Sequence, residues 1–329
     1  MSAFRLLSKG AAAVLALLLL FSVSACHEDA PPPANAVPAR LKVVASFSIL
    51  ADIAANVGGE RIALTTLVGP GGDSHAYEPT PADARAVAAA DVVLVNGLGF
   101  EGWIDRLIEA SGYRGPVVVA TAGITPLAAN VSAHAHAHDD DGRATHDHAA
   151  DTPDPHAWQR LDNARIYVGN IARAFAAADP AGAAVYAANA RAYQQRLDAL
   201  QRQLAARMDA VPRDRRTVIC AHDAFAYLGQ AYGLSFLSPR GLSTQSEPSA
   251  RDVAALITLA REQRVDALFL ENISDPRLLD RIAAETGARI GGTLYSDALS
   301  AGDGLAPTYL ELMRYNATAL ADALQPPVR

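Results

Sequence analysis

The sequence predicts an α/β fold of two (β/α) domains with parallel sheets, joined by one long rigid helix. Short runs that are apolar throughout alternate with helix-like stretches, which is typical of parallel strands buried on both faces. This pattern occurs twice along the 329 residues, half of which are hydrophobic. An uninterrupted helical stretch separates the two occurrences, so we expect two domains with cores of their own.

The first domain is expected over residues 41–178. Strands are predicted at 41–45, 62–68, 91–95 and 116–120, and helices at 49–57, 82–90 and 101–110. Because the strand-like runs are apolar throughout and alternate with helices, they predict a parallel sheet covered on both faces.

One long helix over residues 179–210 is expected to join the domains. Asp179-Pro180 is a helix-start signal, no proline interrupts residues 181–208, and Pro212 ends the stretch. One helical face is predicted to carry Val185, Tyr193, Leu197, Leu200, Leu204 and Met208. At 1.5 Å per residue the helix is roughly 40 Å long, enough to run along both domains. The linker is therefore a rigid strut.

The second domain, residues 211–329, repeats the pattern of the first. Strands are predicted at 216–221, 266–270 and 289–294, and helices at 224–232, 249–263, 276–286 and 306–324. The repetition favours a second parallel sheet with helices on both faces.

The N-terminus predicts export. Residues 1–26 have the form of a signal peptide, with Arg5 and Lys9 before an apolar run that is shorter than a membrane-spanning helix. Val-Ser-Ala-Cys at 23–26 resembles the bacterial lipobox and favours lipidation of Cys26; ordinary cleavage after residue 25 is the alternative. Residues 27–40 contain four prolines and form a tether. We expect a periplasmic protein, anchored to the membrane if Cys26 is lipidated.

The charge argues against a nucleic-acid-binding protein, and the cysteine content argues against a disulfide-bonded fold. The net charge is −7 and no basic stripe is present, which argues against a nucleic-acid partner. If Cys26 is lipidated, Cys220 has no partner for an intramolecular disulfide. Cys220 ends an apolar strand-like run, where a buried inert thiol is expected rather than a metal ligand.

Residues 133–149 form a polar stretch without hydrophobic periodicity that is rich in histidine. Its histidines are His134, His136, His138, His146 and His148, among Asp139, Asp140, Asp141 and Asp147. Imidazole is the commonest metal ligand and is mostly neutral near pH 7. We expect an auxiliary low-affinity metal loop that collects metal, passes it to a main site or senses excess. The alternative is a solvated insertion that binds metal incidentally.

Four further residues predict a main metal site: His75, His156, His222 and Asp297. Each is expected at the end of a strand-like or extended run, and ligands of parallel α/β domains bind at the carboxyl ends of the strands. Each residue alone is weak evidence, because such a histidine often only hydrogen-bonds and such an aspartate often caps a helix. Two come from each half, so one site between the domains can hold all four.

A glycine motif suggests a different ligand and is interpreted as structural. Residues 97–102 match G-x-G-x-x-G between a predicted strand and a helix. A dinucleotide site would require an acidic residue at the end of the next strand, and none follows residues 116–120. The glycines are therefore expected to serve a tight turn and close packing.

Five collinear segments carry a family resemblance: 74–81 (SHAYEPTP), 96–103 (NGLGFEGW), 154–158 (DPHAW), 222–227 (HDAFAY) and 295–299 (YSDAL). They resemble the zinc- and manganese-binding solute-binding proteins of bacterial ABC importers, of the high-affinity zinc uptake type. The resemblance covers essentially the whole mature chain. It implies two small (β/α) domains linked by one long helix, with the metal between them.

The resemblance also implies a ligand set, namely His75, His156 and His222 with Asp297 as the fourth. Manganese-binding relatives usually place Glu where this chain has His222, and imidazole instead of a hard carboxylate favours zinc. A filled shell of three His and one Asp leaves no open position and argues for carriage over catalysis. Glu78 and Glu247 are candidates to orient an imidazole from outside the shell, with a surface salt bridge or cap as the alternative.

The implied function is capture of Zn²⁺ by an exported protein that delivers it to an ABC permease. We further expect the protein to be a monomer and to have a periplasmic metallochaperone as an additional partner. Delivery of manganese or iron is the alternative cargo. An exported zinc hydrolase is the enzymatic alternative, which no H-E-x-x-H motif supports. A metal-buffering or adhesion-linked role is a third possibility.

Overall fold

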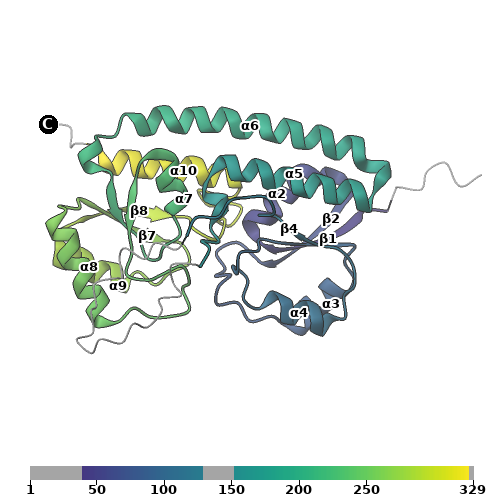
Figure 1. Ribbon diagram of the computed structural model, residues 1–329, viewed down its shortest axis with the longest axis horizontal. Coiled ribbons are helices and arrows are strands. Elements are labelled where there is room, and N and C mark those ends of the chain that lie inside the picture. Colours follow the sequence, from purple (N-terminus) through teal and green to yellow (C-terminus); the bar gives the residue numbers. More distant parts are fainter. Residues whose placement is uncertain (1–38, 129–151, 326–329) are drawn as a thin grey trace, which may run out of the picture. The chain divides into compact units, whose positions relative to one another are not determined.

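Two four-stranded parallel sheets, one in each half of the chain, form the frame of the protein (Figure 1). The computed structural model describes residues 39–128 and 152–325. The predicted signal peptide with Cys26, the tether up to residue 38 and the His-rich loop lie outside these residues. Among the described residues, no helix is both long enough and apolar enough to cross a membrane.

The first sheet contains the four strands predicted for the first half. These are β1 (Leu41–Phe47), β2 (Ile62–Val68), β3 (Val92–Val95) and β4 (Val117–Val119), in the order β2-β1-β3-β4. All neighbouring strands are parallel, and Val43 of β1 is paired with Leu64 on one side and Val92 on the other. Strand β3 is buried at every position, as expected for a strand that helices cover on both faces.

The second sheet repeats the topology of the first. Its strands are β5 (Thr217–Ile219), β6 (Ser235–Leu237), β7 (Ala267–Glu271) and β8 (Arg289–Leu294), in the order β6-β5-β7-β8, all parallel. The prediction missed β6, because three residues are too few to show a periodicity. The strand order reverses between β5 and β7, and ligands of such sheets bind at the carboxyl ends beside this point.

Helices cover both faces of each sheet (Figure 1). Those of the first half are α2 (Ser48–Gly58), α3 (Pro81–Ala88), α4 (Ile104–Ser111) and α5 (Leu161–Ala178). Those of the second half are α7 (Ala226–Tyr232), α8 (Ala250–Glu262), α9 (Arg277–Thr286) and α10 (Tyr309–Leu324). Short 3₁₀ turns are η1 (Gly59–Arg61), η4 (Ala157–Gln159), η5 (Pro180–Gly182) and η6 (Arg213–Arg215). No element had been assigned to the α5 segment from the sequence.

Helix α6 (Ala183–Asp209) is the long helix that the sequence predicted. It packs against α2 and α5 of the first half and against α7 and α10 of the second (Figure 1). Its buried face is formed by Tyr186, Ala190, Tyr193, Leu197, Leu200, Leu204 and Met208. The assignment of Val185 to this face is wrong, since Val185 is 44% exposed. Steps of three and four residues back from Tyr193 reach residues 190 and 186, not 185.

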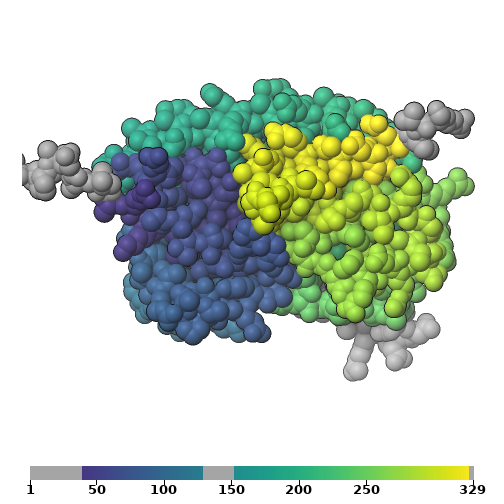
Figure 2. Space-filling model, turned by 180° about the vertical axis from the view of Figure 1, so that it is seen from behind, coloured from purple at the N-terminus to yellow at the C-terminus, as the bar shows by residue number. Residues whose placement is uncertain are grey.

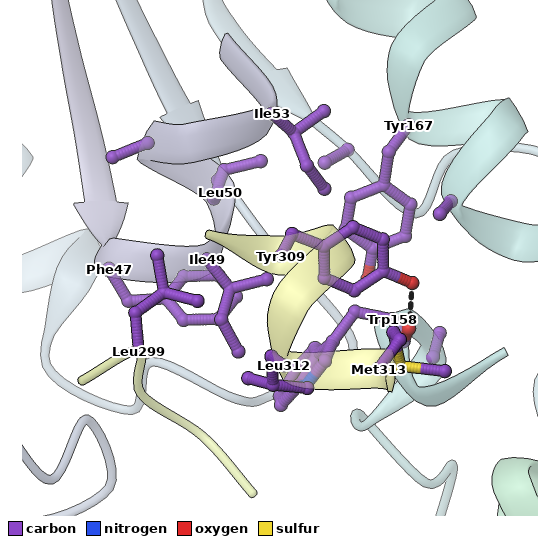
Figure 3. Packing of buried hydrophobic residues seen from close by; sticks show 14 of the residues in the cluster. Phe47, Ile49, Leu50, Ile53, Trp158, Tyr167, Leu299, Tyr309, Leu312 and Met313 are labelled. Atoms are coloured by element: carbon purple, nitrogen blue, oxygen red, sulfur yellow. Dashed lines mark hydrogen bonds between the residues drawn. The ribbon is translucent and has the colours of Figure 1, made fainter. Parts of the chain in front are cut away.

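One hydrophobic core runs through both halves. Phe47 and Ile49 of the first half pack with Leu299 and Leu312 of the second in a single buried cluster (Figure 3). The Tyr309 hydroxyl donates a hydrogen bond to the carbonyl oxygen of Trp158, which joins the start of α10 to the first half. Seen from behind, α10 lies directly against the first half (Figure 2).

The division into domains at residues 41–178, 179–210 and 211–329 remains a prediction. By their contacts, the described residues from Arg40 onward form one compact unit. A smaller second cluster of buried residues, including Ile219, Leu256 and Ile282, belongs to the second half alone. The second half therefore has a small core of its own in addition to the core that both halves share.

Candidate metal centre

Three histidines and one aspartate, far apart in the sequence, meet in one buried cluster: His75, His156, His222 and Asp297. One ligand atom from each lies within 4.8 Å of the others. Oδ2 of Asp297 is 3.3 Å from His75 Nε2 and 3.2 Å from His222 Nε2, and its Oδ1 is 3.7 Å from His156 Nε2. His75 is 5% exposed and the other three are 0% exposed. The structure thus brings together all four predicted residues.

Three of the four follow strands, as expected. His75 lies in the loop between β2 and α3. His222 is the third residue after the end of β5, and Asp297 is the third residue after the end of β8. His156 is the exception, because no described strand leads into it. It precedes η4, after an isolated bridge between Ala128 and Pro153. The expectation that it also ends a strand is wrong, since Pro153 and Pro155 hold an extended backbone without making it part of a sheet.

Aromatic rings enclose the cluster on the first-half side. The Phe100 ring lies 4.8 Å from the His75 ring and 4.7 Å from that of Trp158, measured between centroids. Trp158 in turn lies 5.3 Å from the His156 ring and 5.0 Å from Phe47. These apolar walls restrict the orientation of the imidazoles. They also lower the local dielectric constant, which strengthens the attraction between a cation and the Asp297 carboxylate.

Two buried carboxylates outside the cluster orient two of its imidazoles. Asp154 Oδ1 lies 2.7 Å from His156 Nδ1 and also accepts a hydrogen bond from the His156 backbone N–H. Glu271 Oε2 lies 2.6 Å from His222 Nδ1, and its Oε1 accepts the backbone N–H groups of His222 and Ala221. Each contact turns Nε2 of the imidazole toward Asp297, the arrangement that carboxylates impose on metal-binding histidines.

The sequence had suggested other residues for this role. Glu247 instead forms an ion pair with Arg240 at 2.6 Å and is 80% exposed, which confirms the alternative of a surface salt bridge. Glu78 is exposed in the loop that follows His75. Two signals pointed to the correct residues: Asp154 stands two positions before His156, and Glu271 ends β7, beside β5, the strand that precedes His222.

The buried side chains of the cluster shift one another's pKa values. Burial by itself would lower the pKa of His222, but the carboxylates of Glu271 and Asp297 outweigh it and raise the pKa well above its usual value. Burial would raise the pKa of Asp297, but His222 and His156 outweigh that and hold it well below its usual value. In the absence of metal, a proton on His222 therefore supplies positive charge beside the buried carboxylates of Glu271 and Asp297.

The donor set fits a metal cation better than it fits protons. Both oxygens of Asp297 are buried and accept no well-formed hydrogen bond from the described residues, although imidazole nitrogens lie close by. A buried carboxylate without such partners is costly, and a divalent cation among the four side chains would offset that cost. Three imidazoles and one carboxylate are a donor set that can complete a tetrahedral shell.

The glycine motif at 97–102 is structural, as predicted. Gly97 has φ +88°, and a Cβ at this position would lie 2.5 Å from Cγ1 of Val119, so the turn requires glycine. The buried Glu101 carboxylate accepts hydrogen bonds from the backbone N–H groups of Asn96 and Gly97. Those N–H groups are therefore not available to a phosphate.

Cys220 is a free, buried thiol, as predicted. Burial raises its pKa well above the usual value, with a smaller contribution from the nearby Glu271. Its sulfur lies 3.1 Å from the carbonyl oxygen of His222 rather than toward the ligand atoms. A protonated thiol in this position is inert.

Replacing Glu271 by glutamine should change how metal affinity depends on pH. In the unaltered protein the raised pKa of His222 means that metal must displace a proton, so affinity should rise by about tenfold per pH unit until that pKa is passed. Glu271→Gln removes the negative charge that raises this pKa, so the rise should level off at a lower pH. Above the pH at which the rise levels off, the metal affinity of the variant should be about 10–100-fold weaker than that of the unaltered protein. The reason is that the His222 imidazole is less basic and less well oriented.

The measurement is a zinc–chelator competition titration at several pH values. Glu247→Gln is the matched control, since it removes the same charge from an exposed ion pair and should leave the curve unchanged. A Glu271→Gln curve identical to that of the control would contradict the role assigned to Glu271.

Comparison with known proteins gives a family match over almost the whole described chain. The model of the family described as "ZnuA: Zinc-uptake complex component A periplasmic" matches residues 43–323. The matched range includes all four clustered residues as well as Asp154 and Glu271.

Individual relatives are named for different metals. The iron-binding protein YfeA of Yersinia pestis is 32% identical over 308 residues, 94% of this chain and 93% of the relative. The manganese-binding lipoprotein MntA of Halalkalibacterium halodurans is 33% identical over 285 residues, 86% of this chain and 88% of the relative. The solved structure of the periplasmic zinc-binding protein TroA from Treponema pallidum has a TM-score of 0.77 at 26% identity, covering 87% of this chain and all of TroA.

Proposed function

This chain belongs to the ZnuA family of periplasmic zinc-uptake components, and we propose that it captures Zn²⁺ and delivers it to an ABC permease for import. Members of this family are metal-binding components of ABC transporters and not enzymes, so the zinc hydrolase alternative is discarded. The observation that carries the proposal is the buried cluster of three imidazoles around one carboxylate. We assign His75, His156, His222 and Asp297 as the ligands of the transported ion.

Zinc is proposed as the cargo because of the donor set. Imidazole nitrogen suits Zn²⁺, whereas Mn²⁺ prefers sites richer in oxygen ligands. His222 supplies the third imidazole, and Glu271 makes it a stronger donor. The relatives are named for iron, manganese and zinc, so manganese or iron delivery is the alternative cargo.

The remaining parts of the proposal concern the segments outside the described residues. MntA is named a lipoprotein, which supports lipidation of Cys26 and anchoring of this chain at the periplasmic side of a membrane. We propose that the His-rich loop at 133–149 collects zinc with low affinity for the buried site. The expected monomer and the partnership with a metallochaperone remain predictions.

The test is a chelator-competition titration of the metal-free mature chain with zinc and with manganese. We expect one tight zinc site, strongly preferred over manganese, and weaker sites in the loop. Deleting residues 133–149 should lower the total zinc bound but leave the tight site. Replacing the five loop histidines by asparagine is the matched control, because it keeps the loop length and should have the same effect.

The outcomes separate the alternatives. Manganese binding as tight as zinc binding would move the cargo assignment to manganese. The absence of a tight site for either metal would mean that the buried cluster does not bind the transported ion. Loss of the tight site on loop deletion would place the main ligands in the loop instead.

A further inference from the structure

The proposed metal site is closed in this structure. All four side chains are buried, and the aromatic rings of Phe100 and Trp158 cover one side of the cluster. A hydrated ion cannot reach Asp297, and a bound ion cannot leave, unless some segment around the cluster moves. Which segment moves can be inferred from how each ligand is held.

Separation of the two halves as rigid bodies is disfavoured by their shared packing. The hydrophobic core crosses between them, and α6 contacts helices of both (Figures 1 and 3). Asp52 of α2 accepts a hydrogen bond from the Tyr309 backbone N–H at the start of α10. Opening by a hinge would expose this apolar surface to water, at a cost that grows with its area.

Three of the ligands are held by buried contacts. Asp154 and Glu271 fix the rings of His156 and His222, as described above. The residue before Asp297 is held through its carbonyl oxygen, which accepts hydrogen bonds from Trp158 Nε1 and Gln159 Nε2 at 3.0 and 2.8 Å. These contacts lie within the core and leave little freedom for local movement.

His75 is held from both halves. Inside the first half, Trp103 Nε1 donates a buried hydrogen bond of 2.8 Å to the Ser74 carbonyl oxygen. The contacts that reach this segment from Thr244 and Gln245 of the opposite half lie at the surface. The Thr244 hydroxyl donates a hydrogen bond of 2.6 Å to Asp73 Oδ2, and Asp73 Oδ1 accepts the His75 backbone N–H at 2.9 Å. The Gln245 side-chain amide donates to the His75 carbonyl oxygen. Gln245 is exposed and Thr244 half-buried, so water competes for both contacts. His75 is also the one ligand of the four with measurable exposure.

The His75 loop and the Thr244 loop are each anchored at the C-terminal end by a capped helix. The His75 loop ends in α3, where Thr80 and Asp83 form a capping box. The Thr244 loop ends in α8, where Ser249 and Asp252 form another. The glycine-containing stretch at 69–72 precedes Asp73, and Gly71 has φ +70°. The Gly71 backbone N–H donates a hydrogen bond of 2.9 Å to the Leu299 carbonyl oxygen of the opposite half, so movement of the His75 loop is confined to the residues between Gly71 and α3.

We propose that Thr244 and Gln245 are positioning residues that latch the His75 loop and set the rate at which the bound ion leaves. The latch consists of the Thr244–Asp73 and Gln245–His75 contacts. While it is closed, His75 stays in ligating position; when it opens, one ligand withdraws and the ion is exposed. A partner that competes for Thr244 or Gln245 would release the ion without separating the halves. This inference rests on the proposed function and adds the control of release to it.

The test measures zinc release from the full mature chain by stopped-flow transfer to an excess of a fluorescent chelator. The double variant Thr244→Val/Gln245→Leu should release zinc about tenfold faster, because two hydrogen bonds that hold His75 are lost. The number of tight sites should stay at one, and the unfolding temperature of the metal-free chain should stay within about a degree or two of the original. A merely structural role would lower that temperature.

Matched controls remove the same groups elsewhere in the second half. Thr258→Val deletes a hydroxyl that bonds only the Ala254 carbonyl within α8, and Gln263→Leu changes the residue that caps this helix through its backbone. The two together should leave the release rate unchanged. Asp73→Ala and Thr244→Val should have less than additive effects on the rate, since both remove the Thr244–Asp73 contact.

The outcomes distinguish the latch from the proposed function. If the unaltered chain binds no metal tightly, the proposed function fails, and the latch, which is defined by release of the bound ion, is overturned with it. If it binds zinc tightly and the double variant releases zinc at the original rate, or no faster than the controls, the latch is overturned and the function stands. Fully additive effects of Asp73→Ala and Thr244→Val would equally overturn it.

Discussion

His222→Ala should abolish tight zinc binding. The substitution removes one of four proposed ligands and leaves the buried Glu271 carboxylate without its positive partner. The loss of affinity should exceed the roughly 100-fold that follows loss of an outer partner such as Glu271. The measurement is a chelator-competition titration at a fixed pH near neutrality, with circular dichroism to verify that the variant is folded.

His136→Ala is the matched control for this prediction, because it removes an imidazole from the His-rich loop. It should lower the amount of weakly bound zinc and leave the tight site unchanged. His222→Glu is a second variant that keeps a ligand at this position while replacing nitrogen by oxygen. It should shift the preference from zinc toward manganese. A tight zinc site that survives His222→Ala unchanged would exclude His222 from the ligand set.

Trp158→Ala should have the largest effect on stability. Trp158 is fully buried between Phe47, Phe100 and His156, and its indole N–H donates to the carbonyl oxygen of Ser296 in the other half. Truncating a buried tryptophan typically lowers the free energy of unfolding by about 3–5 kcal/mol, because a cavity remains. We expect a loss in that range for the metal-free chain, measured by urea unfolding.

Two further variants define what the tryptophan contributes. Trp158→Phe keeps most of the ring packing and loses the hydrogen bond to Ser296, so its cost should be smaller than that of Trp158→Ala. Leu305→Ala removes an exposed side chain and should change the free energy of unfolding by about 0.5 kcal/mol or less. A Trp158→Ala value as small as that of Leu305→Ala would show that the core joining the two halves does not support the fold.

Sequence patterns predicted the fold where the pattern was long or uniform. The strands β1 to β4 were found because most of their residues are apolar. Helix α6 was found because helical periodicity continues over 27 residues without proline. Strand β6 was missed because three residues show no pattern. Val185 was assigned to the wrong face of α6. A helical face can be predicted only where several apolar residues follow each other at helical spacing.

By itself, the sequence determined which residue types could form the site and roughly where each would lie. His75, His222 and Asp297 were predicted at strand ends, and the chain also predicted the helix that joins the halves. Only the tertiary structure decided which carboxylates orient the imidazoles and which loop holds His75 from the opposite half. Those contacts join residues up to 171 positions apart, such as Asp73 and Thr244. No local periodicity reports such distant contacts, because they depend on how the two halves of the chain pack against each other.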